Sequence, residues 1–114
     1  MSAASYLADY HTHSRISPDA RHSMTEMARA AAKAGLDEIC FTDHVEPILL
    51  GSGAPREHYD WAALAAEFEA ARADWDGRLT LRLGIELGEA VRDLPRTERL
   101  LAQAPELDFI IGSI

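Results

Sequence analysis

The sequence contains 114 residues, of which 47% are apolar and 26% charged, and it includes 7 glycines and 5 prolines. This composition excludes collagen-like, low-complexity and disordered chains, and the length provides for one hydrophobic core but not for two domains. The formal net charge of −8 repels nucleic-acid phosphates, so we expect no nucleic-acid partner.

The first third of the chain predicts a strand followed by a helix. Residues 6–10 form a short, partly apolar run that is typical of a strand. Ser23 stands three residues before Glu26, which is the spacing of a helix-capping box, and Gly35 is a typical residue just after a helix end. We therefore expect a helix over about residues 24–34.

The middle of the chain predicts two further strands with a helix between them. The runs EICFT at residues 38–42 and LTLRLGIEL at residues 79–87 are rich in β-forming residues and lack helical periodicity, which is typical of strands covered on both faces. Residues 46–58 contain two prolines and two glycines and predict a loop. Apolar residues recur at helical spacing over residues 59–75 and predict the second helix.

The last part of the chain predicts a third helix over about residues 93–103, with Pro95 in its first turn, and a fourth strand over residues 108–114. Strands that alternate with helices imply right-handed crossovers and a parallel α/β sheet. The fourth strand has no closing helix, and a (β/α) barrel needs about 200 to 250 residues. We therefore expect residues 1–114 to form one partial domain, about half of a barrel truncated after its fourth strand.

The sequence also bears on the compartment. Cys40 is the only cysteine, so the chain cannot form an internal disulfide, which fits a reducing compartment. No apolar run approaches the roughly 20 residues of a membrane helix, and residues 1–8 lack the basic and apolar regions of a secretory signal. We therefore expect a cytoplasmic protein without a membrane partner.

Histidine and carboxylate side chains gather at the ends of the predicted strands. Asp9, His11 and His13 occupy alternate positions and therefore point to one side of the first strand. Two imidazoles in this arrangement can chelate a divalent cation, and Asp9 could bind it too or orient a histidine. Alone, the pattern is also compatible with polar residues at a strand end. His44 and Glu86 lie late in the next two strands, where α/β folds collect their ligands, and this favours a metal site.

Four linked segments resemble the motifs of the PHP family, named for polymerase and histidinol phosphatase, and most closely its stand-alone histidinol-phosphate phosphatases. The segments are DYHTHS with the following SPD, then FTDH, GIELGE and IIGSI. The resemblance implies the N-terminal part of a distorted (β/α)₇ barrel that holds two or three metals at the carboxyl ends of its strands. It further implies that His11 and His13 bind one metal, that Glu86 bridges it to a second, and that Asp19 and His44 serve a third.

The ligand types indicate the chemistry. Neutral imidazole and carboxylate favour Zn²⁺, or Mn²⁺ or Fe²⁺, over Ca²⁺, and a bridging carboxylate holds two cations at a spacing suited to phosphoryl displacement. We expect a metal-bound water to attack a small phosphorylated substrate, histidinol phosphate, which yields histidinol and phosphate in histidine biosynthesis. The family's remaining ligands would follow Ile114, so we expect the 114-residue chain to be inactive alone.

Several residues have weaker assignments. Arg15 could contact substrate phosphate through its guanidinium, or could form a surface ion pair. Asp43 could support a metal ligand or cap a turn, and Glu89 could support a ligand or be a loop carboxylate. Cys40 is expected to be a small buried hydrophobe.

Three alternatives to a histidinol-phosphate phosphatase remain open. A PHP phosphoesterase could act on a nucleotide or a nucleic-acid end, which a basic groove would favour. An amidohydrolase-type barrel also carries His-x-His on its first strand, but the linked FTDH and GIELGE segments are not expected there. The third alternative is a non-catalytic, metal-stabilised domain, which activity with and without a chelator would distinguish from the enzymes.

Overall fold

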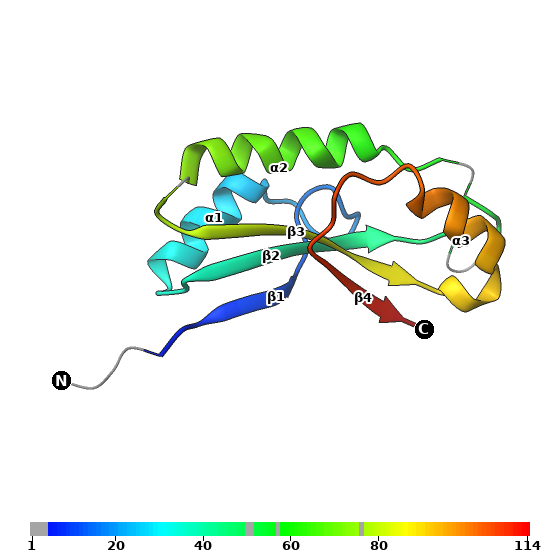
Figure 1. The fold of residues 1–114 in the computed structure, drawn as a ribbon, viewed down its shortest axis with the longest axis horizontal. Helices are drawn as coiled ribbons and strands as arrows, with labels where there is room; N and C mark the ends of the chain where they lie inside the picture. Colours follow the sequence, from blue (N-terminus) through cyan, green and yellow to red (C-terminus); the bar gives the residue numbers. More distant parts are fainter. Residues whose placement is uncertain (1–4, 50–51, 57, 76) are drawn as a thin grey trace.

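The computed structural model describes residues 5–49, 52–56, 58–75 and 77–114 (Figure 1). The first four residues of the segment considered for a secretory signal lie outside this range, as do residues 50, 51 and 57 of the expected loop. No helix within the described ranges is long and apolar enough to cross a membrane.

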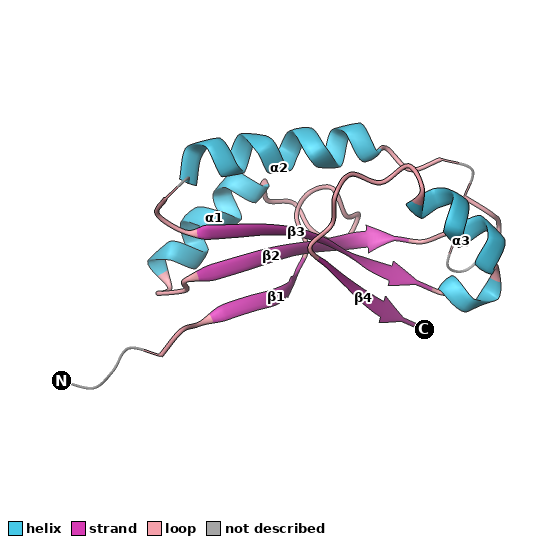
Figure 2. Cartoon of the chain, viewed as in Figure 1, coloured by secondary structure: helices cyan, strands magenta, loops and turns pink. Residues whose placement is uncertain are grey.

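Strands and helices alternate along the chain, with one extra short helix before the last long one. The elements are β1 (Ala8–Thr12), α1 (Met24–Lys33), β2 (Glu38–Val45), α2 (Trp61–Trp75), β3 (Thr80–Gly88), the 3₁₀ helix η1 (Ala90–Arg92), α3 (Leu94–Leu101) and β4 (Phe109–Ser113). The strands form one parallel sheet in the order β1-β2-β3-β4, with α1 and α2 layered on one face (Figure 2). The predicted half-barrel of four parallel strands and three helices is therefore confirmed.

The strand boundaries differ from the predicted ones. β1 begins two residues later than expected and continues to Thr12, and β2 continues to Val45 instead of residue 42. Pairing explains the longer β2, because all eight of its residues are in register with β3, from Glu38 opposite Thr80 to Val45 opposite Leu87. The prediction that this strand is covered on both faces is confirmed, whereas the edge strands β1 and β4 are largely exposed.

The helix ends follow local capping. The predicted capping box is present, since the Ser23 hydroxyl accepts from the N–H of Glu26 at 3.1 Å and the Glu26 carboxylate accepts from the N–H of Ser23 at 3.1 Å. Gly35 follows α1 with φ of +90°, a left-handed conformation that favours glycine. α2 begins at Trp61 instead of residue 59 because Asp60 caps it by accepting from the N–H of Ala63 at 2.9 Å.

The third helix is shorter than predicted, and η1 was not expected. The Asp93 carboxylate accepts from the N–H of Arg96 at 3.0 Å, so Asp93 is the residue that caps α3 rather than part of it. α3 ends at Leu101, two residues before the predicted end.

The core lies between the sheet and the helices. Alternate side chains of β2 and β3 face α1 and α2, and the opposite set, which includes His44 and Glu86, faces the other side. The buried apolar side chains of this layer include Met24, Ala28, Ile39, Phe41, Val45, Leu64, Phe68, Leu81, Leu83 and Ile85. Cys40 is fully buried, and burial raises the pKa of its thiol to about 12, which fits the predicted small hydrophobe.

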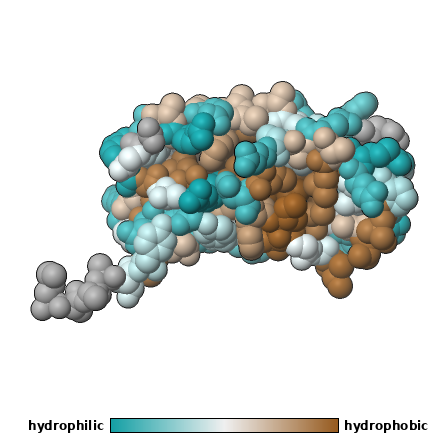
Figure 3. Space-filling view, viewed as in Figure 1, coloured by the Kyte–Doolittle hydropathy of each residue, from teal (hydrophilic) through white to brown (hydrophobic). Residues whose placement is uncertain are grey.

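The sheet curls so strongly that its two edge strands touch across the concave face. The ring of Tyr10 on β1 meets the ring of Phe109 on β4 edge to face, with centroids 5.2 Å apart. A Cβ on Gly84 would lie 2.3 Å from the backbone oxygen of Phe109, so glycine allows β4 this close approach. Apolar surface gathers near β4 and η1 (Figure 3), where Val91 and Ile110 are exposed.

Candidate metal centre

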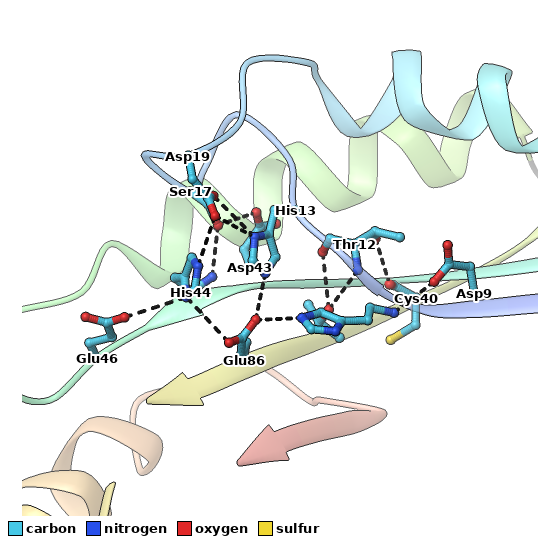
Figure 4. Close-up of polar contacts among 12 residues, drawn as sticks. Asp9, Thr12, His13, Ser17, Asp19, Cys40, Asp43, His44, Glu46 and Glu86 are labelled. Carbon is cyan, nitrogen blue, oxygen red and sulfur yellow. Dashed lines mark hydrogen bonds and ion pairs between the residues drawn. The ribbon is translucent and has the colours of Figure 1, made fainter. Parts of the chain in front are cut away.

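Two strands and the segment after β1 bring the first ligand group together. Glu86 Oε1 on β3 lies 2.8 Å from His11 Nε2 on β1 and 2.8 Å from His13 Nε2 just beyond it (Figure 4). β1 has one more residue than β2 over this stretch, since Asp9 pairs with Ile39 but Thr12 pairs with Phe41. Such a bulge changes the direction of the side chains around it.

The second group uses the carboxyl end of β2. Asp19 Oδ2 lies 3.0 Å from His13 Nδ1 and 3.1 Å from His44 Nε2. The rings of His13 and His44 are close, with centroids 4.2 Å apart. Together the two groups contain all five predicted metal ligands, namely His11, His13, Asp19, His44 and Glu86, and each group could hold one cation.

His13 belongs to both groups, so the position of the proton on its ring decides which of its nitrogens can bind a cation. A neutral imidazole has one nitrogen with a free lone pair, and the other carries a proton. When Nε2 of His13 binds a cation beside His11 and Glu86, its Nδ1–H donates to Asp19, which fixes the ring and its tautomer. Asp19 then orients a ligand of the first group while it offers an oxygen to the second with His44.

The surroundings of Glu86 and Asp19 favour their ionised form, which is the form that binds a metal ion. Burial raises the pKa of Glu86, but hydrogen bonds from His11 and His13 lower it more, and the net pKa lies below its usual value. Burial likewise raises the pKa of Asp19, but hydrogen bonds from His13 and His44 lower it, and the net pKa lies below its usual value. Burial lowers the pKa of His13, while Glu86 and Asp19 raise it to a net value above the ordinary one. Both carboxylates are therefore ionised at neutral pH.

One buried atom of the centre lacks a protein partner. His44 Nδ1 is buried and has no hydrogen-bond partner within the described residues. The nearby carboxylate oxygens, Glu46 Oε1 and Glu86 Oε2, lie 3.6 and 3.9 Å away, beyond hydrogen-bond distance. A buried polar atom without a partner points to an additional bound group. Imidazole and carboxylate donors without thiolate fit Zn²⁺, Mn²⁺ or Fe²⁺.

Asp43 organises the loop that carries the second group. Its fully buried carboxylate accepts from the N–H of Ser14 at 2.6 Å, the hydroxyl of Ser14 at 2.9 Å and the hydroxyl of Ser17 at 2.7 Å. Ser17 Oγ in turn accepts from the N–H of His44 at 2.9 Å. The segment between His13 and Asp19 is thus fastened to β2. The sequence analysis assigned no role to Ser14 or Ser17, although both stand in its quoted motifs.

The other candidate residues lie around the centre. Arg15 donates to both carboxylate oxygens of Glu67 on α2, at 3.0 and 2.9 Å, so the ion pair is the contact that the structure contains. Asp9 accepts from the backbone N–H of His11 at 3.1 Å and is in neither ligand group. Glu89 has a left-handed φ of 56°, and its carboxylate lies 4.0 Å from Arg92, outside both groups. Phosphate contact by Arg15 and support of ligands by Glu89 stay predictions.

The fold and the site define a class: an α/β half-barrel with a histidine and carboxylate cluster at the carboxyl ends of its parallel strands. The PHP domain model matches residues 9–114. The chain therefore belongs to the PHP domain family, which confirms the resemblance found in the sequence.

Relatives with known names are similar to the chain over part of their length. The chain is 33% identical over 113 residues to a probable histidinol-phosphatase of Deinococcus radiodurans, a match that covers 95% of the chain and 42% of that protein. It is 27% identical to the histidinol-phosphatase of Lactococcus lactis subsp. lactis, over 93% of the chain and 38% of that protein. The chain thus spans about two-fifths of these curated relatives.

A solved structure is similar in fold as well. The crystal structure of histidinol phosphate phosphatase from Lactococcus lactis subsp. lactis, complexed with zinc, L-histidinol and phosphate, matches with a TM-score of 0.82 and 27% identity. The match covers 95% of the chain and 40% of that structure. The four parallel strands and three helices therefore correspond to part of the barrel of a PHP histidinol phosphatase.

Proposed function

We propose that the chain contributes to a metal-dependent phosphomonoesterase that converts histidinol phosphate and water to histidinol and phosphate. The observation that carries the proposal is the convergence of His11 and His13 on Oε1 of Glu86, next to the pair Asp19 and His44. The names of the similar proteins support the substrate. Such a reaction belongs to histidine biosynthesis in the cytoplasm.

Each ligand has a distinct task in this proposal. Bound divalent cations activate water and neutralise phosphate oxygens in phosphoryl transfer. Oε1 of Glu86 lies 2.8 Å from His11 Nε2 and from His13 Nε2, whereas its Oε2 lies 3.9 Å from Nδ1 of His44, whose Nε2 contacts Asp19. In this proposal one oxygen of Glu86 serves the first group, and the other would serve a cation bound at His44. Asp19 holds the tautomer of His13 through Nδ1.

Charge in the centre also supports a phosphorylated substrate. As ligands the three imidazoles are neutral, and Asp19 and Glu86 together carry two negative charges. With two divalent cations bound, the cluster has a net positive charge, which attracts a phosphate dianion even though the chain as a whole carries −8.

The test uses the protein expressed from the full reading frame that contains this chain. Phosphate release from histidinol phosphate is measured after zinc loading and after chelation, in the parent and in the variant His11→Ala/His13→Ala. We expect the release rate to fall by at least about a hundredfold on chelation and in the variant. The matched control His22→Ala removes an exposed histidine that lies 3.6 Å from Glu26 and outside the ligand groups, and it should keep the parent rate. Turnover that survives chelation would rule out a metal-dependent enzyme.

A further inference from the structure

A cavity of about 470 Å³ opens beside the second ligand group. Asp19, His44 and Glu46 line it at the metal centre. Its other walls include the guanidinium-bearing Arg56 as well as Ile16, Leu49 and Tyr59. Its volume lies in the range of small-molecule sites, which are mostly apolar with a few placed polar groups. The cavity therefore has the size and position to hold the alcohol that is released when a phosphate ester is hydrolysed.

The apolar wall is held in place by aromatic packing. The ring of Tyr59 meets the ring of Trp61 with centroids 4.6 Å apart, and the indole N–H of Trp61 donates to the backbone oxygen of Leu100 at 3.1 Å. The Tyr59 hydroxyl is buried and has no hydrogen-bond partner within the described part of the chain. The aromatic wall is thus a preformed surface that can pack against a ring or an alkyl chain.

Glu46 provides a carboxylate on the wall of this cavity. Its side chain is 15% exposed, and its Cγ lies 3.2 Å from the place where a Cβ on Gly88 would be, so the glycine leaves room for it. Its backbone oxygen accepts from Arg56 Nε at 3.1 Å. The Arg56 guanidinium carbon lies 6.0 Å from the centre of the Tyr59 ring. Arg56 is thus held by the backbone of Glu46 and by the ring of Tyr59.

We propose that this cavity binds the leaving alcohol of a phosphomonoester and that Glu46 pairs with a cationic nitrogen on that alcohol. The inference rests on the proposed phosphatase function and assigns the leaving-group end of the same site. Glu46 is in neither ligand group, and within the described residues its carboxylate accepts no hydrogen bond, although its Oε1 lies 3.6 Å from His44 Nδ1.

The charge of Glu46 selects the class of alcohol. A carboxylate that is mostly buried is costly to leave without a partner when a bound ligand displaces its water. An ammonium or imidazolium group on the alcohol pairs with it through a charge-assisted hydrogen bond, which is stronger than the bond that a neutral hydroxyl donates, and an anionic alcohol is repelled. The structure therefore favours phosphate esters of amino alcohols over esters of sugars or other uncharged alcohols.

The test measures binding of the free alcohol, so that it does not depend on turnover. L-Histidinol and its analogue without the amino group are titrated into the zinc-loaded protein expressed from the full reading frame. The dissociation constants are measured by calorimetry. We expect L-histidinol to bind at least about tenfold more tightly than the analogue, and Glu46→Gln to reduce this preference to about twofold or less. Tyr59→Leu should weaken both alcohols because it removes the aromatic wall.

Two controls separate the possible failures. Glu98→Gln removes an exposed carboxylate on α3 that does not line the cavity, and it should keep the preference. Thermal unfolding of each variant shows whether it is folded, and Glu46→Asp, which retains the charge, should keep part of the preference. An unchanged preference in folded Glu46→Gln, or equal binding of the two alcohols by the zinc-loaded parent, would overturn the inference. Failure of the parent to bind zinc or phosphate would instead count against the proposed function.

Discussion

Asp43 accepts hydrogen bonds from both the backbone N–H and the hydroxyl of Ser14, at 2.6 and 2.9 Å, although the two residues are 29 positions apart. Both residues are fully buried. The contact fastens the segment after β1 to β2 and so fixes the distance between His13 and His44. A residue outside both ligand groups therefore sets the geometry of the metal centre.

Replacing Asp43 tests this positioning role. Asp43→Ala leaves the N–H of Ser14 and the hydroxyls of Ser14 and Ser17 without their acceptor in a buried environment. We expect the free energy of unfolding to fall by about 3 kcal/mol or more, and zinc affinity to fall as well. Urea denaturation and zinc competition measure the two effects. Asp74→Ala, an exposed site on α2, serves as the control and should change neither quantity.

The proposed bridging role of Glu86 predicts a change in metal stoichiometry. Glu86→Gln keeps the size of the side chain but removes the negative charge that faces His11, His13 and His44. We expect the loss of more than one metal equivalent per chain, because the first group loses its carboxylate ligand and a cation at His44 would lose the nearby negative charge. Elemental analysis measures this directly, with Glu69→Gln on the surface of α2 as the control. Full metal occupancy in Glu86→Gln would show that the carboxylate is structural.

Local patterns predicted the elements for physical reasons, and they favoured a metal site with His11, His13, His44 and Glu86, whereas Asp19 was expected only from the family resemblance. Capping residues and the alternation of strand side chains depend on neighbours in the chain, so Ser23 and Gly35 predicted the limits of α1 well. These four side chains lie at or near the carboxyl ends of successive parallel strands, and β-α-β connectivity places those ends together. This is why His11 and Glu86, which are 75 positions apart, could be expected to meet.

Long-range pairing of side chains was not predictable in the same way. Arg15 forms an ion pair with Glu67, which is 52 positions away in the sequence. Hydrophobic periodicity does not show which carboxylate an exposed arginine will pair with. The role of Ser17 depends on how closely the loop after β1 packs on β2. Glu46 was missed because it follows the quoted FTDH motif by two residues and carries no pattern of its own.

The curl of the sheet predicts unequal effects at two glycines. A Cβ on Gly84 would lie 2.3 Å from the backbone oxygen of Phe109 and 3.1 Å from Cys40 Sγ, so β4 would have to move away. We expect Gly84→Ala to lower the free energy of unfolding by about 2 to 3 kcal/mol. Gly112→Ala on β4 is the matched control, because its Cβ would meet nothing within 4 Å. Equal stability of the two variants in urea would contradict the close approach of β4.

A carboxylate network at the opposite end of the sheet predicts how stability depends on pH. Hydrogen bonds from Tyr10 and Tyr6, together with Arg82, hold the pKa of Glu38 below its usual value. The Tyr6 hydroxyl donates to Glu38 Oε1 at 2.6 Å, and the Tyr10 hydroxyl donates to Oε2. The same hydrogen bond is the largest cause that raises the pKa of Tyr10 to about 12.

These two shifts act at opposite ends of the pH range. The lowered pKa of Glu38 adds stability above the unfolded value of about 4.3, which is lost as the pH falls through the folded value. The raised pKa of Tyr10 adds stability below about pH 10 that is lost as the pH rises towards about 12. We therefore expect Glu38→Gln to flatten the acid limb of a stability–pH curve, and Tyr10→Phe to flatten the alkaline limb. Urea midpoints from pH 3 to 11 measure both limbs, and parallel curves for the parent and the variants would show that this network does not contribute.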